Sequence, residues 1–131
     1  MSARYFRLKY FQLKLANMIS AFITSHAVQP PDIEGKWSWK QGPWHGDFVL
    51  KKNGSSFTGT LDNVFKGTYG DKISDIKVSK NRIKFTRYGR CGVQYWEGTL
   101  ALEDDRLKII DGLWRKEVSD ISCYFSAEKK D

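Results

Sequence analysis

Few side chains in this sequence could act as nucleophiles, general bases or metal ligands. The 131 residues include two histidines, His26 and His45, and two cysteines, Cys91 and Cys123. A zinc site needs several His or Cys ligands close together, and the one histidine beyond residue 31 cannot complete one. A Cys–His nucleophile pair with His45 would need a reactive thiolate, whereas Cys123 lies among apolar residues of a predicted strand. We therefore expect no catalytic residue, no metal site and no cofactor.

The tryptophans could bind a ligand by stacking. Trp39 and Trp44 flank the turn Lys40-Gln41-Gly42-Pro43. Exposed aromatic rings beside such a turn can stack on a sugar ring or on another flat apolar ligand. The alternative is that both rings pack under a neighbouring segment. The other three tryptophans fall on the inward faces of predicted strands and are expected in the core: Trp37, Trp96 and Trp114.

A basic segment, Arg87-Tyr88-Gly89-Arg90, provides a second candidate site. Two arginines beside an aromatic residue can hold a carboxylate, sulfate or phosphate through paired hydrogen bonds. We expect this segment to form a hairpin tip, where the alternative is that basic residues serve only solubility. The predicted ligand-binding residues are Trp39, Trp44, Arg87, Tyr88 and Arg90.

After residue 32, polar and apolar residues alternate in short runs that are separated by Gly, Asn or Asp turns. This period of two predicts strands, and Asn53-Gly54 is the strongest hairpin signal. Gly59, Gly98 and Gly112 stand between large inward side chains, where a closing sheet must bend. The pattern predicts an all-β fold, an eight-stranded antiparallel up-and-down barrel. The expected strands are residues 35–40, 45–52, 55–61, 72–79, 82–88, 93–102, 106–114 and 121–129.

The two cysteines are compatible with one disulfide or with two free thiols. In a simple meander, Cys91 follows the fifth strand and Cys123 lies in the eighth, so their Cα atoms are about 9–10 Å apart. A disulfide needs roughly 7 Å or less. We therefore predict two free thiols.

Residues 1–31 differ from the rest and form a predicted leader, with the barrel domain at 32–131. The leader has no acidic residue, and an apolar stretch at 15–28 leads to Ser25-His26-Ala27 and then to Pro30-Pro31. This arrangement is typical of a secretory signal peptide. An amphipathic helix that lies on a membrane or plugs the barrel remains an alternative, as does a mitochondrial presequence. Secretion or export to the periplasm is expected, against a mitochondrial or membrane-associated location.

The net charge of +7 is unevenly distributed. The leader holds four basic residues, which leaves 18 basic against 15 acidic residues in 32–131. Acidic residues are interleaved with the many lysines of the domain. This balance does not predict a specific nucleic-acid surface.

Several short stretches resemble the small secreted lipocalin-like, or calycin-type, meander barrels. The start Gly35-Lys36-Trp37 is similar to the lipocalin opening strand. The resemblance extends over nearly all of 33–130 and implies a closed barrel. The other stretches that carry it are Phe57-Thr58-Gly59-Thr60-Leu61, Ile83-Lys84-Phe85-Thr86, Trp96-Glu97-Gly98-Thr99-Leu100 and Phe125-Ser126-Ala127-Glu128-Lys129.

An eight-stranded barrel is just wide enough to be filled by side chains or to hold one small ligand. The leading hypothesis is a non-catalytic, exported domain that binds a small molecule or a glycan at an aromatic mouth. The alternative is a structural or protein-interaction module with a filled barrel. The third hypothesis is a weak binder of single-stranded nucleic acid.

Overall fold

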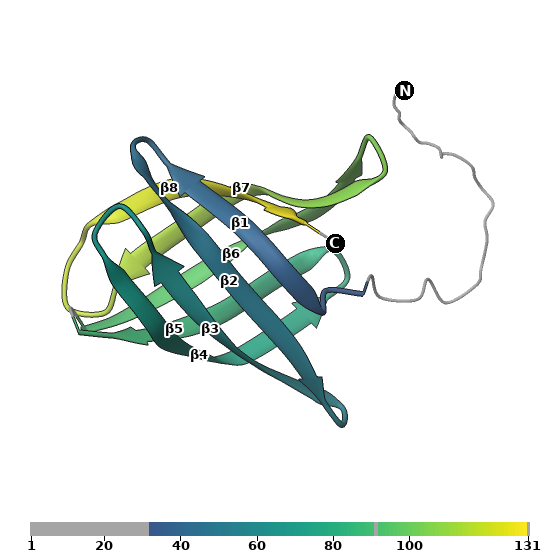
Figure 1. The fold of residues 1–131 in the computed structure, drawn as a ribbon, viewed down its shortest axis with the longest axis horizontal. Coiled ribbons are helices and arrows are strands. Elements are labelled where there is room, and N and C mark those ends of the chain that lie inside the picture. The colour runs from purple at the N-terminus through teal and green to yellow at the C-terminus, as the bar shows by residue number, and fades with distance from the viewer. Residues whose placement is uncertain (1–31, 91, 131) are drawn as a thin grey trace.

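The computed structural model describes residues 32–90 and 92–130. These residues form a closed barrel of eight antiparallel strands in chain order, which confirms the all-β prediction (Figure 1). The predicted leader and Cys91 lie outside the described residues. The strands are β1 (Gly35–Gln41), β2 (Trp44–Asn53), β3 (Ser56–Asn63), β4 (Thr68–Ser79), β5 (Arg82–Gly89), β6 (Gly92–Glu103), β7 (Arg106–Lys116) and β8 (Ser122–Lys129).

Each strand pairs with the next, and β1 pairs with β8 to close the sheet. Four hairpins (β1–β2, β3–β4, β5–β6 and β7–β8) therefore meet at one end of the barrel, on the left of Figure 1. We call this end the mouth. The long connection predicted over 62–72 is shorter than expected, because β3 continues to Asn63 and β4 begins at Thr68.

Aromatic side chains fill the interior. Trp96 is 1% exposed and lies at the centre, with its ring 4.6 Å from Phe125, 5.3 Å from Trp39 and 5.7 Å from Phe85 between centroids. The three tryptophans predicted as core are all buried, at 0%, 1% and 5% exposure: Trp37, Trp96 and Trp114. Burial of these large rings stabilises the fold. The barrel is thus packed rather than hollow.

The end opposite the mouth is closed from within by Ile33, which is fully buried just before β1. The Trp37 Nε1–H donates to the Ile33 carbonyl oxygen at 2.9 Å. This bond satisfies the buried indole nitrogen and holds the entering chain across the barrel end.

A groove opens between β3 and β4 at that same end. The two strands pair from Gly59–Ile73 towards the mouth, and in the described residues no pairing joins 56–58 to 74–79. The β4–β5 register shifts between Ser74 and Lys77, because β4 has one residue more than β5 there. Asp75, with a φ of 54°, lies in this bulge, and a bulge of this kind bends its strand. The groove that results has a volume of about 1060 Å³ and is floored by Ile33, Phe57, Ile76 and Val78.

Period-two alternation in the predicted strands 93–102 and 121–129 places Leu102 on the face of Trp96 and Ile121 on the face of Phe125, yet both are exposed. Leu102 is 71% exposed because the β6–β7 hairpin extends beyond the barrel wall (Figure 1). Ile121 is 56% exposed because β8 begins one residue later, at Ser122. Cys123 carries a free thiol, half-buried against the core, as predicted for this residue.

Candidate functional site

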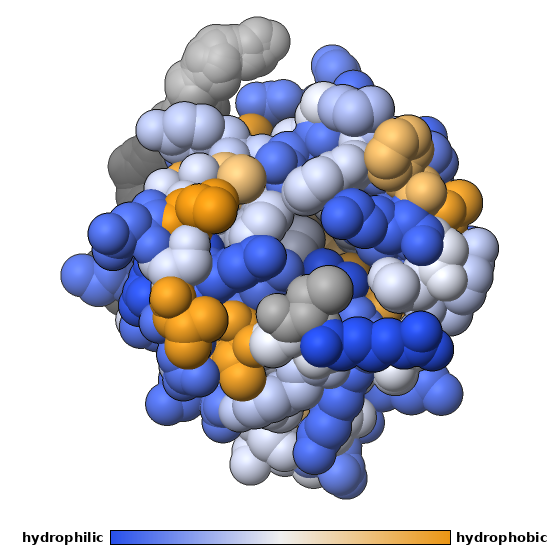
Figure 2. Space-filling view, turned by 90° about the vertical axis from the view of Figure 1, so that its left-hand side faces the viewer, coloured by the Kyte–Doolittle hydropathy of each residue, from blue (hydrophilic) through white to orange (hydrophobic). Residues whose placement is uncertain are grey.

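The interior of the barrel changes from apolar to polar at the mouth. Towards the mouth, the inward side chains of β5 are Ile83, Phe85 and then Arg87. In β6, which runs in the opposite direction, Trp96 is followed towards the mouth by Gln94. Arg87 and Gln94 are buried, at 9% and 8% exposure. Seen end-on, this face is mainly hydrophilic, with hydrophobic groups in separate places around it (Figure 2). The last inward positions of the strands therefore form a polar ring above the aromatic core.

A small pocket of about 80 Å³ lies in this ring. That is roughly the volume of two or three water molecules in the liquid, so the pocket accepts a small group rather than a whole large ligand. The pocket is lined by Trp39, Gln41, Trp44, Asn63, Lys66, Thr68, Asp71, Arg87, Gly89, Arg90, Gly92, Gln94, Trp96, Trp114 and Lys116.

The polar floor is held by an ion pair between β4 and β5. Arg87 donates through Nε at 2.9 Å and through Nη2 at 2.7 Å to Oδ2 of Asp71. Arg87 Nη1 donates to Oε1 of Gln94 at 3.2 Å, and Trp96 Nε1 donates to the same oxygen at 3.0 Å. The Arg87 and Asp71 side chains are only 10% and 12% exposed. These four hydrogen bonds join Asp71, Arg87, Gln94 and Trp96 into one network across β4, β5 and β6.

The aromatic wall of the pocket consists of Trp44 and Trp114. Their rings stack with centroids 6.5 Å apart and an interplanar angle of 23°. Trp114 Nε1 donates to Oε1 of Gln41 at 2.6 Å, and Lys66 Nζ lies 5.0 Å from the Trp44 ring centroid. Trp44 is half-buried, so part of its ring remains accessible at the mouth. A cation next to an accessible indole suits an acidic ligand that carries a ring.

The structure brings four of the five predicted binding residues together at this pocket: Trp39, Trp44, Arg87 and Arg90. Two expectations are corrected. Trp39 is 2% exposed and not an exposed mouth ring, because its indole packs against Trp96 and donates to the Asp62 carbonyl oxygen at 2.9 Å. Its edge still lines the pocket.

The second correction concerns the basic segment. Arg87 and Tyr88 belong to β5, in agreement with the strand predicted over 82–88, and the turn begins only after Gly89, so the segment as a whole is not a hairpin tip. Arg87 faces inward because it follows Ile83 and Phe85 at a spacing of two. Tyr88 consequently faces outward, is 44% exposed and does not line the pocket.

Sequence reasoning missed several residues of the pocket, although a signal for some of them existed. Gln94 shares the inward series of Trp96, and Asn63 shares that of Leu61. A polar residue at the end of an inward apolar series is such a signal. Lys66 and Lys116 carried none, since charged residues near hairpins are common on any surface.

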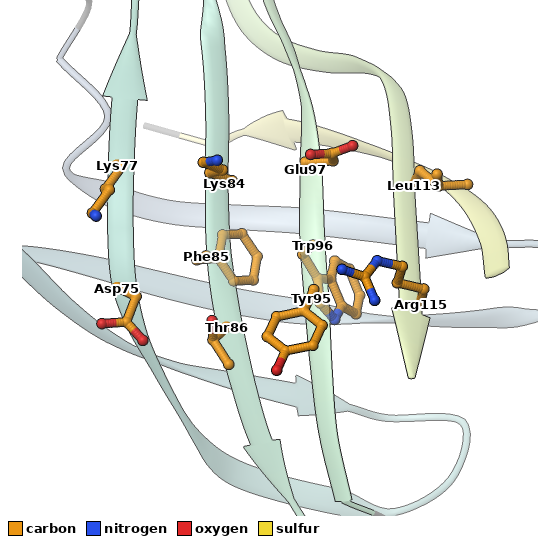
Figure 3. A pocket seen from close by; sticks show the side chains of 10 residues that line it. All are labelled: Asp75, Lys77, Lys84, Phe85, Thr86, Tyr95, Trp96, Glu97, Leu113 and Arg115. Atoms are coloured by element: carbon orange, nitrogen blue, oxygen red, sulfur yellow. The ribbon is translucent and has the colours of Figure 1, made fainter. Parts of the chain in front are cut away.

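A second, larger pocket of about 280 Å³ lies on the outer surface of β4–β7 (Figure 3). Three of its polar groups, Arg115, Tyr95 and Glu97, have partners of their own. Arg115 Cζ lies 4.7 Å from the Tyr95 ring centroid, Tyr95 Oη donates to Glu117 Oε2 at 2.7 Å, and Glu97 is 3.7 Å from Arg82. Because these contacts link the charges to each other, the mouth is the better candidate site.

Within 32–90 and 92–130, no three His, Cys, Asp or Glu side chains are grouped so that they could hold a metal ion. The same residues include no helix that is long and apolar enough to cross a membrane. His45 is exposed and its Nδ1 lies 3.2 Å from the Pro43 carbonyl oxygen. No family model, no curated protein and no solved structure matches this chain.

Proposed function

We propose that this chain is a non-catalytic binding domain that takes the ring of a small molecule or of a sugar at the mouth of its barrel. The observation that carries the proposal is the stacked Trp44–Trp114 pair, which forms one wall of a pocket with a fixed polar floor. An apolar wall with a few placed polar groups is the usual composition of a small-ligand site.

Two further features support the proposal. A closed barrel of eight antiparallel strands has the general shape of the lipocalin-like class, whose barrels hold one small ligand. The acid-free basic leader, followed by an apolar stretch, supports export from the cytoplasm. The packed interior limits the ligand to the mouth, and a long chain-like ligand along the barrel axis has no room.

The test is calorimetric titration of the full chain with glucose, N-acetylglucosamine, glucuronate and benzoate. Trp44→Ala should weaken binding of every ring compound that the wild type binds, because it removes the accessible stacking surface. Tyr88→Ala is the matched control, since Tyr88 is an exposed aromatic of β5 outside the pocket. Thermal melts check that both variants fold. Equal affinities of wild type and Trp44→Ala would contradict the proposal.

A second candidate function, a protein-interaction module with a filled barrel, is favoured by the groove between β3 and β4. Residues 56–58 and 74–79 each pair on only one side within the described chain. Unpaired strand edges above an apolar floor suit an extended segment of a partner protein.

Two valine variants test this candidate. Val78→Lys places a charge in the groove, whereas Val118→Lys places the same charge on an exposed site near the mouth. The candidate is supported if a partner protein binds the wild type and Val118→Lys but does not bind Val78→Lys. Binding of that partner should also slow hydrogen exchange of the backbone amides in 74–79. A partner bound equally by all three chains would exclude the groove.

A further inference from the structure

Three side-chain amides line the mouth pocket, and in each the oxygen is already occupied by a donor from the protein. Gln41 Oε1 accepts from Trp114 Nε1 at 2.6 Å. Asn63 Oδ1 accepts from the Lys66 backbone N–H at 3.1 Å. Gln94 Oε1 accepts from both Trp96 and Arg87. These three amides come from β1, β3 and β6, around one pocket.

The donors determine which way each amide is turned. An indole, backbone or guanidinium N–H can pair only with the amide oxygen, so the NH₂ group must occupy the other position. No acceptor within the described residues pairs with any of the three NH₂ groups. Asn63 and Gln94 are 5% and 8% exposed, so these residues have little contact with bulk water. A buried donor without an acceptor is costly, which indicates a site for an acceptor-rich group.

The charges around the pocket also favour a ligand group that is rich in hydrogen-bond acceptors. Four cationic side chains line it, whereas Asp71 is its one anionic residue. Oδ2 of Asp71 is already occupied by two hydrogen bonds from Arg87. The pocket is therefore rich in donors, poor in acceptors and positively charged. The cations are Lys66, Arg87, Arg90 and Lys116.

We propose that the mouth pocket is an oxyanion site, in which the NH₂ groups of Gln41, Asn63 and Gln94 and the surrounding cations hold the carboxylate, sulfate or phosphate group of the ligand. A single group of this kind fits a volume of about 80 Å³. This inference rests on the proposed function, because it assigns the class of ligand: a ring compound with an acidic group, such as a uronic acid or an aromatic acid. Trp44 then contacts the ring while the floor holds the anion.

The side-chain NH₂ groups can be observed directly in a ¹H–¹⁵N spectrum of the full chain. Titration with sodium sulfate, against sodium chloride at equal ionic strength, should shift the NH₂ signals of Gln41, Asn63 and Gln94. The signals of Asn53, in the hairpin at the opposite end, should stay in place. Equal responses to sulfate and chloride would overturn the proposal.

Isosteric variants then test whether the anion binds beside the amides. Gln94→Glu and Asn63→Asp keep the oxygen that accepts from the protein and replace NH₂ by a second oxygen. Each should weaken glucuronate and sulfate binding at least about tenfold, as expected when a hydrogen bond to a charged group is lost. Asn53→Asp is the matched control, because it changes the net charge by the same amount away from the pocket.

The results distinguish this inference from the proposed function. If glucose binds as tightly as glucuronate and only Trp44→Ala weakens both, the ring site stands and the oxyanion site is wrong. If sulfate shifts the three NH₂ signals but no ring compound binds, the oxyanion site stands and the ring site is wrong. If Gln94→Glu and Asn63→Asp bind glucuronate as the wild type does, the assignment of the amides is wrong.

Discussion

At the scale of single residues, the tryptophans differ in how far they are buried. Trp37 and Trp96 are buried in the interior, whereas Trp44 presents part of its ring to solvent. Each buried indole donates to a fixed oxygen, the Ile33 carbonyl for Trp37 and Gln94 Oε1 for Trp96. The same residue type thus serves packing in one place and, in our proposal, ligand contact in another.

Trp96→Ala should lower the free energy of unfolding by about 3–5 kcal/mol, because it leaves a large cavity at the centre of the core. It also leaves an oxygen of Gln94 with one donor fewer. Chemical denaturation measures the loss. A variant as stable as the wild type would mean that the inward face of β6 is assigned wrongly.

Asp71→Ala should cost about 3–5 kcal/mol, because it leaves the buried Arg87 guanidinium without its counter-charge. Glu128→Ala, which removes an exposed pair with Arg106, should cost about 1 kcal/mol or less. Denaturant melts of the two variants give the comparison. A similar cost for both would show that the pair at the mouth is solvated.

Tyr95 provides a test by pH. Its hydrogen bond to the Glu117 carboxylate raises the pKa of Tyr95 above the ordinary value of 10.0. A raised folded pKa means that the bond stabilises the fold at pH below 10 and that this contribution is lost as the pH rises through the raised pKa. Glu117→Leu should bring the pKa of Tyr95 down, as followed by the ring NMR signals. An unchanged pKa in the variant would exclude the bond as the cause.

At the scale of elements, irregularities in the register shape the barrel. The β6–β7 and β7–β8 registers shift near Gly98 and Gly112, two of the glycines predicted at bends. A Cβ at Gly112 would lie 2.5 Å from the Phe125 carbonyl oxygen, so a side chain there would push the strands apart. Asp75 and Asp111 take positive φ at two such shifts, a conformation that aspartate tolerates better than most residues.

The β6–β7 hairpin contains a strained turn that can be improved. Asp104 and Asp105 have φ of 52° and 61°, as in a two-residue turn with both residues left-handed. Asp105→Gly should raise the stability by about 0.5–1 kcal/mol, because glycine adopts this φ without a steric penalty. Asp105→Ala, which keeps a Cβ and loses the polar side chain, should not stabilise. Thermal melts of both variants decide the matter.

At the scale of the whole molecule, the described residues, 32–90 and 92–130, contain eight strands and the core between them. These described residues pair the strands into a closed barrel, and Ile33 is fully buried at the end opposite the mouth. The four basic residues of the leader are likewise remote in sequence from the cations of the pocket.

Residues 29–131 expressed alone should therefore unfold in one cooperative transition at a temperature close to that of the full chain. Circular dichroism at a β-sheet wavelength measures it, with the full chain as the control. Loss of the transition would mean that the leader is part of the folded domain and would remove the main support for a cleaved signal peptide.

The fold was largely predictable because the period of two assigns each side chain to a face without knowledge of its partners. Trp37, Trp96 and Trp114 were placed correctly for that reason. Trp39 shares the series of Trp37, and the expectation that it would be exposed gave too much weight to its position near a turn. Arg87 also follows an inward series of its strand. A charged residue can be buried only beside a counter-charge, and the counter-charge here, Asp71, lies sixteen residues away in the sequence. Local sequence therefore did not show that Arg87 could be buried.

The sequence alone determined the number of strands, their order along the chain and the face that most residues occupy, since these follow from local periodicity and turn chemistry. The tertiary structure decided which inward side chains meet at the mouth. That depends on the stagger with which β8 closes onto β1, and on the shifts in register at 75, 98 and 111. No short stretch of sequence encodes this stagger, because it is set by the packing of all eight strands together. Gln41, Asn63 and Gln94 therefore become one site only when the barrel closes.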